Sequence, residues 1–203
     1  MSHSSSALVL IEYQHDWLTP DGKLFHLIED EDLRSSSLAR SRNALEAARA
    51  AGVRVVHAGL RFQTGYPELG SGERWGLRRH IPAAGSFPAD GPGSAFVSPF
   101  SPAPGEVVVS GRTGASAFAG SNLDSILRNN RITDLYLMGY AAHVCVESTL
   151  RQAHDLGYDT TVIVDATAAF NRMQQTYFAE QVIPHFGNAI TAAAFASRLA
   201  SGR

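Results

Sequence analysis

Residues 134–156 constrain the fold most strongly, because their hydrophobic pattern changes period within a few positions. Residues 135–138 form a short continuous apolar run, which is typical of a strand buried on both faces of a parallel sheet. From residue 143 onward the apolar positions recur at helical spacing, at Val146, Leu150, Ala153 and Leu156. A strand that passes directly into a helix indicates one unit of an α/β fold.

The same alternation extends over most of the chain. Strands are predicted at residues 7–11, 53–58, 106–109, 135–138, 160–164 and 189–191, and helices at 36–51, 121–129, 143–156, 173–183 and 193–199. This order favours a parallel six-stranded sheet with helices on both faces, a Rossmann-like three-layer α/β arrangement. With 203 residues, 44% of them apolar, the chain is long enough for one domain spanning residues 1–203. The Ser-rich residues 1–6 are predicted to be a flexible N-terminus.

Residues 61–105 interrupt this regularity and hold seven of the nine prolines. We expect an irregular excursion with one short helix near residues 75–80. Long loops inside a compact domain are usually functional or mobile. The excursion would form a pocket wall or a subunit contact.

The charge and composition narrow the partners. A formal net charge of −2 without basic clusters gives no electrostatic basis for binding nucleic acid or an anionic membrane surface. No apolar segment reaches the roughly 18 residues of a membrane-spanning helix, and the start of the chain does not resemble a secretory signal. A single cysteine excludes an internal disulfide and is consistent with a reducing cytoplasm. We therefore expect a cytoplasmic protein whose partners include neither nucleic acid nor membrane.

Cys145, the only cysteine, stands near the first turn of the helix predicted from residue 143. Free backbone N–H groups and the positive end of the helix dipole would lower the pKa of its thiol and make it nucleophilic. The same N–H groups could stabilise an oxyanion on an attacked carbonyl. The alternative, that Cys145 is a small buried hydrophobic residue, is equally compatible with this segment.

Glu12, Arg112 and Cys145 each follow a different predicted strand. Ligands of open parallel sheets bind at the carboxyl ends of the strands, so a carboxylate, a cation and a thiol could meet in one crevice. The carboxylate could then take the thiol proton while the cation holds the charges together. Taken singly, Glu12 could be a capping or salt-bridge residue and Arg112 a solvated charge.

Five motifs carry a resemblance to a known family. They are LVLIEYQHDW at 8–17, VVHAGLRFQTGYPE at 55–68, GRTGASAFAGSNLDSIL at 111–127, GYAAHVCVESTLRQAHDLGY at 139–158 and VDATAAF at 164–170. The chain resembles the isochorismatase-like cysteine hydrolases over about residues 7–189, most weakly in 61–105.

The resemblance implies a six-stranded parallel sheet and an Asp, Lys and Cys triad that hydrolyses small, non-peptide amide C–N bonds. It places the nucleophile at Cys145 and the oxyanion hole at the N–H groups of Ala141 and Cys145, with a cis peptide bond between Tyr140 and Ala141. The family aspartate is Glu12 here and the family lysine is Arg112. Both changes keep the sign of the charge, so a compensated triad, with Glu12 as general base and Arg112 as electrostatic anchor, competes with a decayed site.

The resulting prediction is a cysteine-dependent amidohydrolase that works through a thioester. Two alternatives stay open: an isochorismatase-type vinyl-ether hydrolase, which does not need the cysteine, and a catalytically inactive binding protein on the same fold. The family also implies assembly as a homo-oligomer, a dimer or larger.

Substrate contacts are predicted from position after strands or within the excursion, although such side chains are often core or interface residues. They are Asp16, Trp17, Phe62, Trp75 and Phe118. The nicotinamidases of this family bind zinc through an Asp-x-His motif after the second strand. Residues 58–68 read AGLRFQTGYPE and lack this pair, so we predict no metal and no cofactor.

Overall fold

The structure, a computed structural model, describes residues 5–71 and 74–201. Its six strands form one sheet in the order β3-β2-β1-β4-β5-β6, and every neighbouring pair is parallel. The strands are β1 (Ser6–Ile11), β2 (Arg54–Ala58), β3 (Val107–Val108), β4 (Asp134–Tyr140), β5 (Asp159–Ala168) and β6 (Asn188–Ile190). The predicted six-stranded parallel sheet is thereby confirmed.

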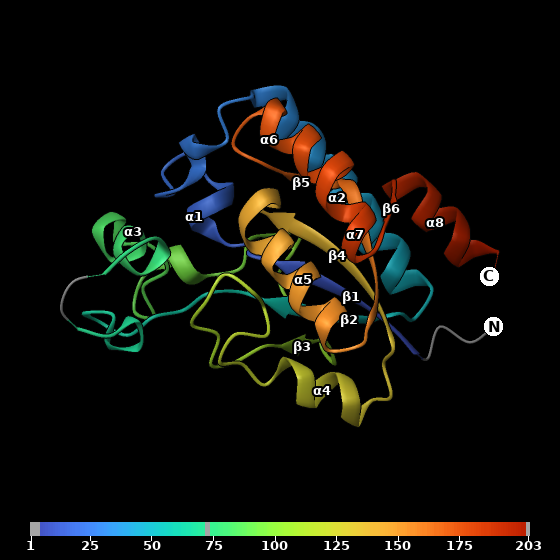
Figure 1. Cartoon of the computed structure of the whole chain (residues 1–203), viewed down its shortest axis with the longest axis horizontal. Coiled ribbons are helices and arrows are strands. Elements are labelled where there is room, and N and C mark those ends of the chain that lie inside the picture. The colour runs from blue at the N-terminus through green and yellow to red at the C-terminus, as the bar shows by residue number, and fades with distance from the viewer. Residues whose placement is uncertain (1–4, 72–73, 202–203) are drawn as a thin grey trace.

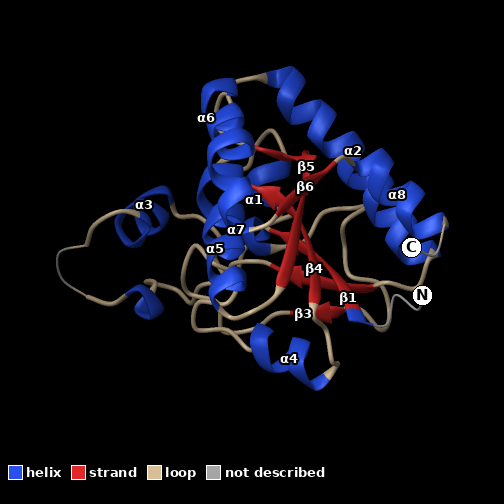
Figure 2. Ribbon diagram, turned by 45° about the vertical axis from the view of Figure 1, so that its right-hand side comes forward, coloured by secondary structure: helices blue, strands red, loops and turns tan. Residues whose placement is uncertain are grey.

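Helices cover both faces of the sheet (Figures 1 and 2). Alternate side chains of β1 enter opposite cores, with Leu8 and Leu10 in one and Val9 and Ile11 in the other. The first core lies under α2 (Glu31–Ala50) and α8 (Ala192–Ala200), and the second under α4 (Leu123–Asn129), α5 (Glu147–Asp155) and α7 (Ile183–Phe186). Burial on both faces explains why the strands read as continuous apolar runs.

Three helices differ most from their predicted bounds. The helix α2 begins at Glu31 instead of residue 36, because the Asp30 side chain caps it by accepting a hydrogen bond from the Leu33 N–H at 2.8 Å. The helix predicted from residue 143 opens with a π-helical turn over Ala142–Val146 before α5. The helix predicted at 173–183 is α6 (Arg172–Tyr177), a second π-helical turn (Phe178–Val182) and α7.

The N-terminal segment is described from Ser5 onward. Residues 1–4 of the expected flexible N-terminus lie outside the described residues. Ser5 is held by its carbonyl, which accepts a hydrogen bond from the Thr133 N–H at 2.9 Å, and Ser6 is the first residue of β1.

No helix within the described ranges is long and apolar enough to cross a membrane.

The described residues of the 61–105 segment contain little regular structure. Its helix α3 (Leu77–Ala84) lies beside α1 (His15–Leu18) in Figure 1, away from α8. Three-residue 3₁₀ turns lie within this segment at Pro67–Leu69 and Pro92–Ser94, and another lies at Phe25–Leu27, after α1. The buried Gln14 amide ties the excursion to the end of β1: it donates to the carbonyls of Leu60 and Ser94, each at 2.7 Å.

After β1 the chain continues toward one edge of the sheet, and after the neighbouring strand β4 it continues toward the other edge. From β1 it proceeds to β2 and β3, and from β4 to β5 and β6. The two backbones are close where they diverge, since a Cβ atom on Gly139 would lie 2.0 Å from the Ile11 carbonyl oxygen. Only glycine fits there, and a crevice opens at such a switch point.

Candidate active site

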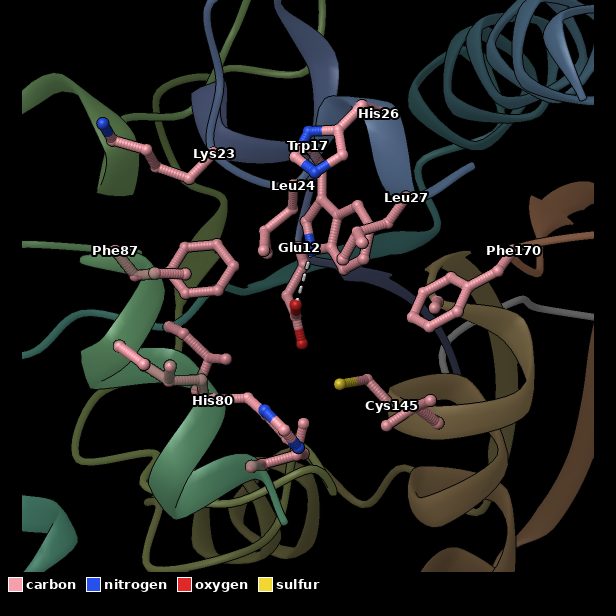
Figure 3. Close-up of a pocket in the computed structure, with 17 residues that line it drawn as sticks. Glu12, Trp17, Lys23, Leu24, His26, Leu27, His80, Phe87, Cys145 and Phe170 are labelled. Atoms are coloured by element: carbon pink, nitrogen blue, oxygen red, sulfur yellow. Dashed lines mark hydrogen bonds between the residues drawn. The ribbon is translucent and has the colours of Figure 1, made fainter. Parts of the chain in front are cut away.

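The structure brings the three residues predicted as a triad together at this switch point. Glu12 directly follows β1, Cys145 lies in the π-helical turn after β4, and Arg112 reaches in from the loop after β3. Each is nearly inaccessible, with 1%, 4% and 3% of its surface exposed, respectively. Figure 3 shows the Cys145 thiol directed toward the Glu12 carboxylate.

The Glu12 carboxylate is fixed through both of its oxygens. Oε1 accepts a hydrogen bond from Arg112 Nη2 at 2.6 Å, and Oε2 accepts one from Trp17 Nε1 at 2.8 Å. The backbone of Glu12 has a φ of 60°, a left-handed conformation that non-glycine residues adopt at a cost and often at functional sites. These constraints hold the carboxylate in one orientation beside the sulfur.

Arg112 uses its guanidinium for the protein itself. Besides Glu12, it donates to four backbone carbonyl oxygens, those of Ala58, Gly114, Ala115 and Ser116. A planar group with five N–H donors suits this arrangement of acceptors, whereas a lysine ammonium has three donors on one nitrogen. The side chain therefore neutralises and orients Glu12.

The thiol environment corrects one expectation. Burial, and next the charge of Glu12, raise the pKa of the Cys145 thiol well above its ordinary value, while Arg112 opposes this rise. Three of the N–H groups at the start of the helix are already engaged, because those of Val144, Cys145 and Val146 all donate to the Ala141 carbonyl, at 3.1, 3.0 and 3.2 Å. The resting sulfur is a protonated thiol that faces a carboxylate.

The peptide bond between Tyr140 and Ala141 is cis, as the family resemblance implies. It ends β4 at the point where the chain turns into the π-helical turn carrying Cys145. Of the two N–H groups expected to form the oxyanion hole, that of Cys145 already donates to the Ala141 carbonyl in the free protein.

A cavity of about 670 Å³ opens over Glu12 and Cys145. Apolar side chains form most of its wall, among them Leu24, Leu60, Leu77, Ile81, Phe87 and Phe170. Polar side chains in the lining are those of Lys23, His26 and His80, all three of them exposed. Figure 3 shows Phe87 and Phe170 on opposite sides of the two central residues.

Trp17 is the one predicted substrate contact that lines this cavity, and it also donates to Glu12. Trp75 is 66% exposed and lies outside the lining. Phe62 is fully buried beside the ring of Tyr66, with 5.7 Å between the ring centroids. Phe118 stacks on the ring of Tyr158 at 5.8 Å within the core.

Asp16 is likewise absent from the lining and has a structural role. Its carboxylate accepts hydrogen bonds from the backbone N–H of Phe87 at 2.6 Å and of Lys23 at 3.2 Å. Both of these residues line the cavity. Asp16 therefore joins two walls of the cavity without facing its interior.

Sequence reasoning missed most of the apolar wall. The spacing of Leu77, Ile81 and Ala84 is a signal in the sequence, since residues four and three apart share one face of a helix. Phe87 and Phe170 lie in irregular segments and carry no such signal. The described residues include no group of three or more His, Cys, Asp or Glu side chains arranged to hold a metal ion.

Comparison with known proteins relates the chain to one family. A family model described as the isochorismatase domain matches residues 6–194. The ureidoacrylate amidohydrolase RutB of Stutzerimonas stutzeri strain A1501 is 34% identical over 177 residues, which cover 82% of this chain and 71% of that protein.

Solved structures give the same relation. A cysteine hydrolase from Pseudomonas syringae pv. phaseolicola 1448A superposes with a TM-score of 0.85 at 21% identity, covering 100% of this chain and 96% of that one. An isochorismatase family protein from Burkholderia thailandensis superposes with a TM-score of 0.77 at 27% identity, covering 97% and 96%.

Proposed function

The chain belongs to the isochorismatase family, and we propose that within it the protein is a cysteine-dependent hydrolase of a small amide, cleaving a non-peptide C–N bond. The observation that carries the proposal is the Cys145 thiol facing a carboxylate that Arg112 and Trp17 hold in place inside a cavity. The name of the curated relative, an amidohydrolase, supports the choice of an amide.

In the first step, Glu12 accepts the proton of Cys145 as the sulfur attacks the substrate carbonyl carbon. Because burial raises the pKa of the thiol, a free thiolate is scarce and the proton moves as the S–C bond forms. The hydrogen bonds to Arg112 and Trp17 keep the accepting carboxylate oriented through this transfer.

The developing oxyanion lies at the N–H groups of Ala141 and Cys145, which supply the electrostatic stabilisation. The Cys145 N–H then turns from the Ala141 carbonyl, or shares its hydrogen bond, as charge builds on the substrate oxygen. The position of the cis peptide bond directly before the nucleophile's turn supports this assignment.

Collapse of the tetrahedral intermediate breaks the C–N bond. The protonated Glu12 gives its proton to the departing nitrogen, ammonia or an amine leaves, and a thioester remains on Cys145. Glu12, again a carboxylate, takes a proton from water as the water oxygen attacks the thioester, and the acid product departs with the thiol restored. Arg112 remains a charged anchor throughout.

Ammonia release from a panel of primary amides tests the proposal. We expect turnover by the wild type, none by Cys145→Ala, and turnover within about twofold of the wild type for Ser35→Ala, an exposed serine on α2 that serves as control. Equal turnover by the wild type and Cys145→Ala would overturn the thiol mechanism.

The same variants separate the alternatives. Vinyl-ether hydrolysis that survives Cys145→Ala and fails in Glu12→Gln would favour the isochorismatase-type reaction. Tight ligand binding without turnover of any amide or vinyl ether would favour a binding protein. The homo-oligomer that the resemblance implies stays a prediction, as does the cytoplasmic location inferred from the single cysteine. Light scattering on the purified protein tests the first.

A further inference from the structure

We propose that the substrate is an amide of an apolar carboxylic acid with a ring-sized or branched acyl group, selected by one face of α3. We call this face, Leu77, Ile81 and Ala84, the α3 wall. The inference rests on the proposed function, because it assumes that the carbonyl carbon binds at Cys145. It concerns what the rest of the cavity accepts.

The α3 wall is an amphipathic helix face turned toward the catalytic residues. All three of its members line the cavity, at the spacing that places side chains on one side of a helix. On the opposite side of the helix, Arg78 and Arg79 are exposed and outside the lining. Apart from His80, which also lines the cavity, the helix therefore presents hydrocarbon to the substrate, and its arginines face water.

The remaining walls match this character. Leu24 and Leu27 reach the cavity from the segment after α1, and Phe87 and Phe170 flank Glu12 and Cys145 from two sides. A cavity of about 670 Å³ is within the usual size range of pockets that enclose whole organic ligands. A substrate as small as acetamide would leave most of this apolar surface in contact with water.

Among the described residues of the lining, no lysine or arginine side chain points toward the reacting centre, where it could bind a substrate carboxylate. The Lys23 side chain points away from Glu12 and Cys145 in Figure 3. His80 reaches into the cavity from α3, but its side chain is exposed to water, as is that of His26. A second carboxylate inside the cavity would lie against hydrocarbon and near the buried Glu12 anion, which is unfavourable on both counts. The chemistry of the wall therefore selects against an acidic acyl group.

The apolar wall is also held in place before substrate binds. The Asp16 carboxylate bonds the backbone of Phe87 and of Lys23, and the Tyr66 hydroxyl donates to the Ser86 carbonyl at 3.0 Å. These contacts fix the two segments that flank α3 and α1. A pre-formed apolar wall binds a matching group without first ordering loops.

The test compares kcat/KM for three primary amides: acetamide, phenylacetamide and succinamate, the last carrying a carboxylate. We expect phenylacetamide to exceed acetamide by about 50-fold or more, since each buried methylene contributes about fourfold. Succinamate should be no better than acetamide.

Two variants locate the effect on α3. Leu77→Ser should lower the phenylacetamide-to-acetamide ratio by about fivefold, and because Leu77 is 37% exposed, this change leaves the packed core intact. Arg79→Ala, on the solvent side of the same helix, should leave the ratio unchanged. A ratio near one in the wild type, or a preference for succinamate, would overturn the proposal while Cys145-dependent turnover continued.

Binding gives a readout that is independent of turnover. Calorimetry of the same three amides on the Cys145→Ala variant should rank phenylacetamide first. Failure of the proposed function would appear differently, as absent hydrolysis or as hydrolysis that survives Cys145→Ala. If phenylacetamide binds no tighter than acetamide in the calorimeter, the assignment of substrate class is wrong whatever the reaction proves to be.

Discussion

Replacing Arg112 by lysine is the substitution on which the family pattern and the structure disagree most clearly. The resemblance places a lysine at this position, so by analogy Arg112→Lys should be harmless. The structure predicts damage, because the guanidinium donates to Glu12 and to four backbone carbonyl oxygens on the segments around Ala58 and Ser116. A lysine nitrogen that stays near Glu12 cannot reach them all.

The size of the effect follows from the hydrogen bonds that a lysine cannot make. The carbonyl oxygens of Ala58 and Ser116 would keep a donor, because they also accept from the backbone N–H groups of Glu12 and Ala119. Those of the half-buried Gly114 and Ala115 would each lose a hydrogen bond, worth about 0.5–1.5 kcal/mol. The expected loss is therefore about 1–3 kcal/mol of unfolding free energy, out of the 5–15 kcal/mol typical of a domain. Turnover should fall as well, since a lysine that lacks these backbone hydrogen bonds holds Glu12 Oε1 less rigidly than the anchored guanidinium does.

Urea unfolding at neutral pH measures this change, with Arg128→Lys as the matched control. Arg128 pairs with Asp124 on the surface of α4, with 56% of its side chain exposed, so its replacement should shift stability by no more than about 0.5 kcal/mol. If Arg112→Lys unfolds at the same urea concentration as the wild type, the reasoning about the guanidinium hydrogen bonds is refuted.

Three further predictions follow from the same geometry. The pKa of the Cys145 thiol is raised by burial and then by Glu12, so alkylation by iodoacetamide should be slow near neutral pH and its midpoint should fall in Glu12→Gln; a wild-type midpoint below about pH 7 would contradict this. Trp17→Phe removes the donor to Glu12 Oε2 and should lower kcat about 10- to 100-fold with little change in KM, whereas a change in KM alone would mean that Trp17 only binds substrate. Burial lowers the pKa of His57 from its usual value although Glu106 lies 2.7 Å away, so the folded protein favours the neutral imidazole; the stability this contributes is fully present above the unfolded pKa and is lost as the pH falls below about 6.5. His57→Gln should therefore reduce the drop in melting temperature between about pH 7.5 and pH 5.5, and an unchanged drop would assign the pH dependence to other groups.

The sequence was sufficient for the architecture, because strands buried on both faces must be continuous apolar runs. Residues 7–11 and 135–138 were recognisable for this reason and now lie side by side as β1 and β4. The same rule located Glu12 and Cys145, since Glu12 directly follows β1 and Cys145 lies in the turn after β4, and these strands meet at the switch point. The rest of the site depends on contacts that no local pattern encodes.

Trp17 and Asp16 illustrate the limit. They are adjacent in sequence and were both predicted to contact substrate, yet Trp17 reaches Glu12 while Asp16 turns to the backbone of Phe87. The difference depends on the short α1 turn and on how residues 61–105 fold back over it. The raised pKa of Cys145 could not be read from the sequence either, because it depends on burial and on the charge of Glu12, 133 positions away in the chain.

Mass spectrometry of the protein quenched in acid during turnover of a primary amide tests the central claim most directly. If Glu12 activates the Cys145 thiol, the peptide that contains Cys145 gains the mass of the acyl group in the wild type, and no peptide gains it in Cys145→Ala. Steady ammonia release by both proteins, with no acylated peptide in either, would contradict the account.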